Sequence, residues 1–305
     1  MKSTLRAICT IVCGICLIAR GLSAEDKIKV VTTIPDLADM TRQIGGDLVD
    51  VSSLATGVED IHAVPMKPSF AVTLNKADAV VVVGLEAEHA FMPALLDASR
   101  NPKIQRDQPG YIDTSVYITP LEVPTRIDRA LGDQHPMGNP HINLDPVLAK
   151  DMVRAIADGL ARLDPANEST YKANLVTYTA KLDAAIARWE KEAAPLKGVP
   201  VVVYHKDFSY FINWAGMREV ASLEPKPGIP PTPSHLAELI DQMKSSPAKV
   251  IVYSPYNSSQ AAEFLSSRAN IPVVMMPFTV GGSDKAKDLF GLFDDTIQRL
   301  LGALK

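Results

Sequence analysis

Two runs of consecutive apolar residues constrain the fold of this chain more than any other feature. They read AVVVVG at residues 79–84 and VPVVVYH at residues 199–205, and neither alternates between apolar and polar positions. A strand that is apolar at every position is covered on both faces, which is typical of parallel strands packed between helices. We therefore expect an α/β fold built on parallel sheets.

The segments around the first run alternate between strand and helix patterns. IKVVTT at 28–33 is rich in β-branched residues, whereas IPDLADMTRQIGG at 34–46 has helical spacing and ends in glycine. This alternation is the pattern of a doubly wound lobe. It predicts further strands at 50–54, 79–83 and 111–121, and further helices at 67–76 and 89–99.

The second half of the chain begins with two helical patterns, at 146–163 and from 166 to about 194, which Asp164-Pro165 separates. The second helix is longer than usual and predicts a strut between two lobes. An alternation then resumes, with strands at 199–204, 218–223, 249–253 and 272–275 and helices at 208–215, 233–245, 258–269 and 285–303. We expect two doubly wound parallel-sheet lobes joined by one long backbone helix. The predicted lobes span 25–165 and 197–305, and the linking helix spans 166–196.

Residues 1–24 have the pattern of a secretory signal peptide. Lys2 and Arg6 precede an apolar stretch from Ala7 to Ala19, which is shorter than the ~20 residues of a membrane-spanning helix. We expect export to the periplasm, with cleavage near Ala24. Cys16 offers an alternative lipidation site, although the residues before it fit that signal poorly.

The cysteines, Cys9, Cys13 and Cys16, all lie in this leader. Disulfides and thiolate ligands are therefore excluded from the mature protein, and any metal must be held by His, Asp or Glu. The whole chain has a formal net charge of -4, and the leader contributes only basic charges, so the mature part is more acidic still. This charge argues against a nucleic-acid partner and suits a protein that handles cations.

The stretch GDQHPMGNPHINLDP, residues 132–146, interrupts the α/β pattern. Its prolines fix φ and remove backbone donors, which predicts a stiff loop carrying His135 and His141. Asp145 is expected to cap the helix that begins around Pro146. Histidine is the commonest metal ligand, but two histidines in one loop do not by themselves define a site.

Two other histidines follow predicted strands. His205 ends the apolar strand VPVVVYH, so it emerges at the carboxyl edge of a parallel sheet, where open α/β sheets bind ligands. His62 follows the strand that ends near Leu54, at the equivalent edge of the first lobe. Together with His141, these residues place three imidazoles around one cleft. Three neutral nitrogens at about 2.0–2.1 Å suit zinc and, more generally, borderline divalent ions.

Three motifs in this order resemble those of the zinc- and manganese-binding solute receptors of bacterial ABC importers, the TroA-like or cluster A-I family. They are EDIHAVPMKPSFAVTLNKAD around His62, NPHINLDP around His141 and YHKDFSYFINWAG from Tyr204, and EPKPGIPPTPSHLAELI from Glu224 is similar to a further family segment. The resemblance covers nearly the whole mature chain. It implies a periplasmic, monomeric receptor that binds a divalent cation through His62, His141 and His205 and docks transiently with a membrane ABC permease.

The chain departs from this family at one ligand position. Many members carry a carboxylate in a turn before the last helix, and the aligned turn here is PFTVGGSD, with Phe278 at the expected position. Asp284 is the nearest substitute, and it is interpreted either as the fourth ligand or as the N-cap of the last helix. Water is the alternative ligand. Zn²⁺ is the expected ion, with Mn²⁺ as the alternative, because manganese prefers more oxygen ligands.

The remaining histidines are assigned outside the site. His135 is interpreted as a loop residue that at most assists ion capture, while His89 and His235 are placed on solvated helix surfaces, His89 beside Glu86 and Glu88. Asp60 is expected to orient His62 or its loop.

Three alternative functions remain. They are a secreted zinc-dependent hydrolase, a manganese or iron receptor of the same family, and an adhesin or structural surface protein that carries zinc. The hydrolase requires a general base beside an open metal position. The sequence has no H-E-x-x-H or Gly-x-Ser-x-Gly motif, and Asp207 and Glu224 are weak candidates for the base. We therefore expect a binding protein and not an enzyme.

Overall fold

The computed structural model describes residues 27–128, 130, 132 and 134–305. The predicted signal peptide at 1–24 lies outside these residues. Within them, no helix is both long and apolar enough to cross a membrane.

Two parallel sheets form the framework, and they have the same strand order. The first runs β2-β1-β3-β4 and the second runs β6-β5-β7-β8. Every neighbouring pair is parallel, as the two valine runs predict. The strands are β1 (Ile28–Thr32), β2 (Val49–Ser53), β3 (Ala79–Val82), β4 (Tyr111–Asp113), β5 (Pro200–Val203), β6 (Arg218–Ser222), β7 (Val250–Tyr253) and β8 (Val273–Met275).

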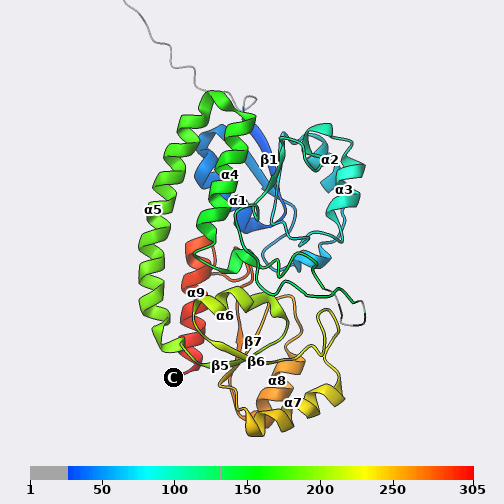
Figure 1. The fold of residues 1–305 in the computed structure, drawn as a ribbon, viewed down its shortest axis with the longest axis vertical. Helices are drawn as coiled ribbons and strands as arrows, with labels where there is room; N and C mark the ends of the chain where they lie inside the picture. The colour runs from blue at the N-terminus through cyan, green and yellow to red at the C-terminus, as the bar shows by residue number, and fades with distance from the viewer. Residues whose placement is uncertain (1–26, 129, 131, 133) are drawn as a thin grey trace, which may run out of the picture.

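Helices cover both sheets, and the longest of them connects the two lobes. In Figure 1, α5 (Glu168–Ala193) runs along one side of the molecule past both lobes, and α9 (Leu289–Ala303) lies beside it. The two doubly wound lobes and the long linking helix are therefore confirmed. The other helices are α1 (Pro35–Gly45), α2 (Pro68–Asn75), α3 (Met92–Ser99), α4 (Ala149–Leu163), α6 (Ser209–Trp214), α7 (Pro233–Ser245) and α8 (Gln260–Ala269).

Besides the helix expected at 285–303, which begins only at Leu289 after its cap Asp288, three predicted boundaries were wrong for local reasons. The strand expected at 111–121 ends at Asp113, whose Oδ1 accepts hydrogen bonds from the N–H and the hydroxyl of Ser115 and so turns the chain. The helix expected from Pro146 begins at Ala149. Asp145 caps only the turn before it, by accepting from the N–H of Val147 at 2.8 Å.

The third boundary concerns the helix expected at 89–99, which begins only at Met92 because Leu85 and Glu86 have positive φ and form a turn. Glu88 in this turn is buried, contrary to the prediction that it lies on a solvated surface. Its Oε1 accepts hydrogen bonds from the hydroxyl of Thr33 and the N–H of Val83, both at 2.7 Å.

One of two apolar clusters spans both lobes. It includes Val31 of the first sheet, Val201 of the second and Trp189 of α5, whereas the smaller cluster lies within the second lobe. The Trp189 ring lies 5.0 Å from that of Phe293 in α9, and its Nε1 donates to Asp294 Oδ1 at 2.6 Å. Because a close-packed core resists sliding, this continuity opposes large movements of one lobe against the other.

Helix α1 also ties the lobes together through two carboxylates. Asp36 is fully buried, and its oxygens accept hydrogen bonds from the side chain of Asn143 at 3.2 Å and the N–H of Val280 at 2.9 Å. Asp39 accepts from the N–H of Leu289, the first residue of α9, at 3.0 Å. These bonds join α1 to the loop that carries Asn143, to the segment after β8 and to the start of α9.

We expect the stability of the fold to depend on the ionisation of Asp36. Burial raises the pKa of Asp36 from 3.8 to about 7, against the opposing effect of its hydrogen bonds. The folded chain therefore holds this proton more tightly than the unfolded chain, so the contribution of Asp36 to stability falls as pH rises between these values. We compare the unfolding free energies of the metal-free natural chain and the Asp36→Asn variant. The natural chain's value relative to the variant's is expected to fall by about 2–3 kcal/mol between about pH 5 and pH 8. Urea unfolding measures both values, and a difference independent of pH would contradict the prediction.

Candidate metal centre

His62 lies in a short 3-10 turn, η2 (Ile61–Ala63), which follows β2. The N–H of His62 donates to Oδ1 of Asp60 at 2.8 Å, so the prediction that Asp60 orients this loop is confirmed. Nδ1 of His62 lies 3.1 Å from the carbonyl oxygen of Ala87. Since a carbonyl oxygen only accepts hydrogen bonds, Nδ1 of the neutral ring carries the proton and Nε2 carries the lone pair.

His141 lies in the proline-rich loop, and Asn139 fixes its backbone. Oδ1 of Asn139 accepts from the N–H of His141 at 2.9 Å, while its Nδ2 donates to Glu122 Oε2 and to the carbonyl oxygen of Lys206, each at 2.9 Å. The hydroxyl of Tyr210 donates to the Asn139 carbonyl oxygen at 2.7 Å. The loop is therefore stiffened by hydrogen bonds to the second lobe as well as by its prolines.

His205 lies two residues after the end of β5, a central strand of the second sheet. Its Nδ1 donates to Oε2 of Glu224 at 2.6 Å, and the same oxygen accepts from the N–H of Gly228 at 2.9 Å. Glu224 thus sets the orientation and tautomer of the His205 ring, as carboxylates commonly do for metal-binding histidines. This leaves Nε2 of His205 to face an ion.

The structure brings the three predicted histidines together between the lobes. One ligand nitrogen from each of His62, His141 and His205 lies within 4.8 Å of the others. Nε2 of His62 and Nε2 of His141 are 3.4 Å apart. Two nitrogens bound to one tetrahedral ion at about 2.0–2.1 Å are themselves about 3.4 Å apart, so this pair already has the spacing of a shared ion. Pockets lined by His205 adjoin the site on two sides, one with His141 and one with His62.

The surroundings of His141 and His205 shift the pKa values of these two rings in opposite directions. Burial lowers the pKa of His141 well below its usual value, and the charges of His62 and His205 lower it further. Burial also lowers the pKa of His205, but the hydrogen bond to Glu224 and the negative charge of Asp207 outweigh it and raise the pKa to about 9. His141 is therefore neutral and ready to bind, whereas an ion must displace a proton from His205.

Asp207 is a residue of the site that sequence reasoning considered only as a weak general base. It is fully buried, and its Oδ1 lies 3.6 Å from Nε2 of His141. The hydroxyls of Tyr256 and Ser254 donate to its two oxygens. Burial raises the pKa of Asp207, and the charge of His205 acts in the opposite direction. Its carboxylate supplies negative charge beside the imidazoles, and its position two residues after His205 was the available signal.

The fourth ligand position has no carboxylate from the expected turn. Phe278 is buried, and its ring lies edge-on to His141 with centroids 5.4 Å apart. Asp284 is exposed and belongs to neither of the metal-ligating groups found among the described residues. Its interpretation as a helix N-cap was wrong, because Asp288 caps α9 by accepting from the N–H of Gly291 at 2.7 Å.

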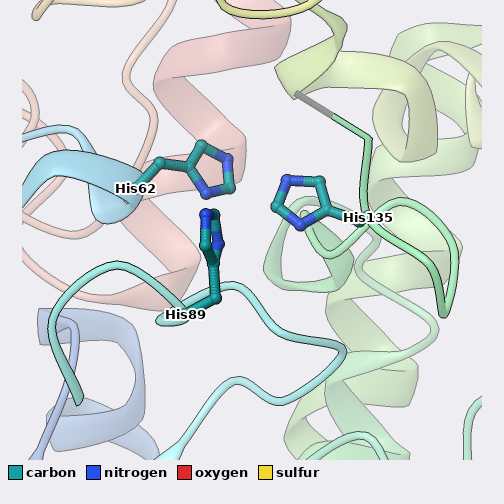
Figure 2. Close-up of side chains that lie close together, drawn as sticks. All are labelled: His62, His89 and His135. Carbon is teal, nitrogen blue, oxygen red and sulfur yellow. The ribbon is translucent and has the colours of Figure 1, made fainter. Parts of the chain in front are cut away.

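A second histidine group lies beside the first. One ligand nitrogen from each of His62, His89 and His135 also lies within 4.8 Å of the others. Figure 2 shows the three rings facing one another, with His89 and His135 on separate loops. The assignment of His89 to a solvated surface was therefore incomplete, since the residue is exposed but also faces His62.

Comparison with known proteins gives one family across nearly the whole described chain. The family model described as ZnuA, the periplasmic component A of the zinc-uptake complex, matches residues 30–303. A solved structure titled as the crystal structure of ZnuA superposes with a TM-score of 0.77 at 28% identity, covering 92% of this chain and 100% of that one.

Named relatives differ in their metal. The zinc-binding lipoprotein AdcA of Streptococcus pneumoniae serotype 4 is 25% identical over 85% of this chain and 52% of its own, so this chain spans about half the length of that relative. The high-affinity zinc uptake system protein ZnuA of Bacillus subtilis is 25% identical over 93% of this chain and 88% of its own. The manganese ABC transporter substrate-binding lipoprotein PsaA of Streptococcus anginosus is 23% identical over 88% and 85%.

Proposed function

The chain belongs to the family of periplasmic zinc-uptake components, and we propose that it captures one divalent cation, zinc, between its lobes and delivers it to an ABC permease. The observation that carries the proposal is that the side chains of His62, His141 and His205 lie close together. These residues come from loops far apart in the sequence. The family description and the named relatives support an extracytoplasmic location and a permease partner. We propose that the receptor acts as a monomer.

Zinc is favoured over manganese and iron by the ligand chemistry. Three imidazole nitrogens suit zinc, whereas manganese prefers sites richer in oxygen. Relatives named for manganese and iron nevertheless exist, so the ion has to be determined on this chain.

We assign the fourth position to water rather than to Asp284. Asp284 is exposed and outside the histidine group, so the turn that carries it would have to move to reach the ion. Asp207 is nearer, with Oδ1 3.6 Å from Nε2 of His141, but it also belongs to neither of the metal-ligating groups among the described residues. Its proposed role is to balance the charge of the ion, which favours a cation in a buried place.

The rival function, a zinc-dependent hydrolase, requires a base near an open metal position. Three nearby carboxylates are engaged: Glu224 holds His205, Asp207 accepts two hydroxyl donors, and Asp60 accepts from the N–H of His62. Membership of a receptor family also favours binding without catalysis. Hydrolysis by the zinc-loaded chain that disappears on metal removal would support the rival instead.

Elemental analysis and competitive titration of the purified mature chain test the proposal together. The expected result is one ion per chain, with zinc bound more tightly than manganese and with a higher unfolding temperature when zinc is present. Tighter binding of manganese would support the alternative receptor, and the absence of stoichiometric binding would overturn the function.

Glu224→Gln is expected to lower the affinity for zinc by about 10–100-fold. Glutamine retains an oxygen acceptor for Nδ1 of His205 but loses the negative charge that supports the bound imidazole. Competitive titration measures the change. Glu238→Gln is the matched control, because Glu238 is exposed and lies 3.7 Å from Nδ1 of His235, outside the site. Equal affinities for the two variants would show that Glu224 does not tune the site.

A further inference from the structure

His62 belongs to both histidine groups, and this shared membership carries a further inference. We propose that His62, His89 and His135 form a second, outer binding position for a divalent cation, and that it cannot be filled while the inner position is occupied. The proposal rests on the inner site formed by His62, His141 and His205. The outer position would take the same borderline divalent ions, because it also offers three imidazoles.

The geometry of the outer group resembles that of the inner one. The rings of His62 and His135 have centroids 4.7 Å apart, and those of His89 and His135 are 5.6 Å apart. Figure 2 shows a nitrogen of the His62 ring directed towards His89. Nδ1 of His89 lies 3.0 Å from the carbonyl oxygen of Glu86 and so carries the proton of the neutral ring, which leaves Nε2 to bind an ion. A small shift of this exposed ring would bring the ligand nitrogens towards the spacing of about 3.4 Å that a shared tetrahedral ion needs.

Exclusive occupancy follows from the chemistry of one imidazole. A neutral imidazole has a lone pair on one nitrogen and a proton on the other. With Nδ1 of His62 donating to Ala87, its Nε2 lone pair is directed to the inner position, 3.4 Å from Nε2 of His141. Binding at the outer position uses that same lone pair, or else moves the proton to Nε2 and breaks the bond to Ala87. In either case His62 serves one ion at a time.

The two positions differ in exposure. His141 is 2% exposed, whereas His89 is exposed, and His135 lines both pockets beside the site. The outer position is therefore closer to solvent, and an ion there would exchange faster. Because it also lacks the buried carboxylate near His141, we expect it to bind more weakly than the inner position.

A double-mutant cycle tests the proposal with zinc as the probe. His205→Ala removes one inner ligand and leaves the outer group intact. In that background, His89→Ala is expected to lower zinc affinity at least tenfold further, whereas in the natural chain it changes affinity less than twofold. His135→Ala is expected to behave in the same way. His235→Ala is the matched control and is expected to have no effect in either background, since its ring contacts Ser222 and Glu238 away from the site.

Three outcomes decide the matter. An equal effect of His89→Ala in both backgrounds would overturn the outer position. Two zinc ions bound at once by the natural chain would overturn exclusive occupancy. The two proposals can also be told apart. If the natural chain binds one zinc tightly and His205→Ala weakens that binding, the proposed receptor function stands. If His89→Ala then has no effect in either background, the outer position alone is overturned. Variants with substitutions at exposed His89 are expected to fold, and circular dichroism verifies this.

Discussion

His141→Ala is expected to weaken zinc binding by more than about 100-fold. The substitution removes the buried side chain that we propose as a ligand, which is neutral before the ion arrives and whose Nε2 already lies 3.4 Å from that of His62. Loss of a residue that merely supports a ligand typically costs 10–100-fold in affinity, so loss of the ligand itself should exceed that range. Competitive titration with a chelator of known affinity measures the change.

The control for this prediction is His235→Ala, which removes an imidazole from the same lobe as His205 but outside the site. Nε2 of His235 lies 3.0 Å from the carbonyl oxygen of Ser222. This variant should retain the affinity of the natural chain. Unchanged affinity in His141→Ala would mean that the proline-rich loop does not provide a ligand.

Gly57→Ala is expected to destabilise the fold by about 1–3 kcal/mol. A Cβ at Gly57 would lie 2.1 Å from the carbonyl carbon of Gly281, a distance that backbone atoms cannot tolerate. The two glycines lie where the loop after β2 meets the segment before α9, and the Thr279 hydroxyl donates to the Gly57 carbonyl oxygen at 3.2 Å. The added methyl group would separate these segments. Because the Gly57 loop leads to His62, zinc affinity should fall as well.

Gly302→Ala provides a matched control with the opposite expected sign. Gly302 lies in α9, and a Cβ there would meet no atom within 4 Å. Alanine in a helix is more favourable than glycine by about 0.5–1 kcal/mol. Urea unfolding of both variants should give a loss for Gly57→Ala and a gain for Gly302→Ala. A stability loss of equal size in both would show that the close approach at Gly57 is not the cause.

Much of the fold followed from local pattern. The unbroken valine runs of β3 and β5 indicated parallel strands, and the long helical pattern ending near Ala194 matched α5. Two of the proposed ligand histidines could be placed for a related reason. The carboxyl ends of parallel strands meet at one edge of a sheet, so His62 and His205 could be placed without knowing the distance between them.

The predictions that were wrong or incomplete concerned residues whose positions depend on contacts between distant segments. Glu88 is buried where its carboxylate accepts a hydrogen bond from Thr33. Glu224 reaches His205 only because β5 and β6 pair side by side. Likewise, His89 and His135 lie close to His62 because of how their loops fold, and strand and helix patterns in the sequence do not predict the positions of loops. Asp284 illustrates the converse, since its position in the sequence suggested a cap, while Asp288 provides it.

Large movements of one lobe against the other are opposed by more than the long helix α5. The shared core and the two α1 carboxylates hold the lobes together, and α9 packs against both α5 and α1. Ion release is therefore expected to involve the loops that carry the histidines more than a wide hinge motion. A small movement of these loops would be enough to release the ion, because a metal site is sensitive to ligand shifts of a few tenths of an ångström.

X-ray absorption spectroscopy at the zinc edge of the one-to-one complex tests the central claim most directly, because it counts the imidazoles bound to the ion. The expected spectrum has three imidazole nitrogens and one oxygen at about 2.0–2.1 Å. His141→Ala, loaded with zinc at high concentration, should show one imidazole fewer at the inner position or a changed set of ligands. A natural chain whose zinc is bound mainly by oxygen atoms, with fewer than two imidazoles, would contradict the three-histidine site.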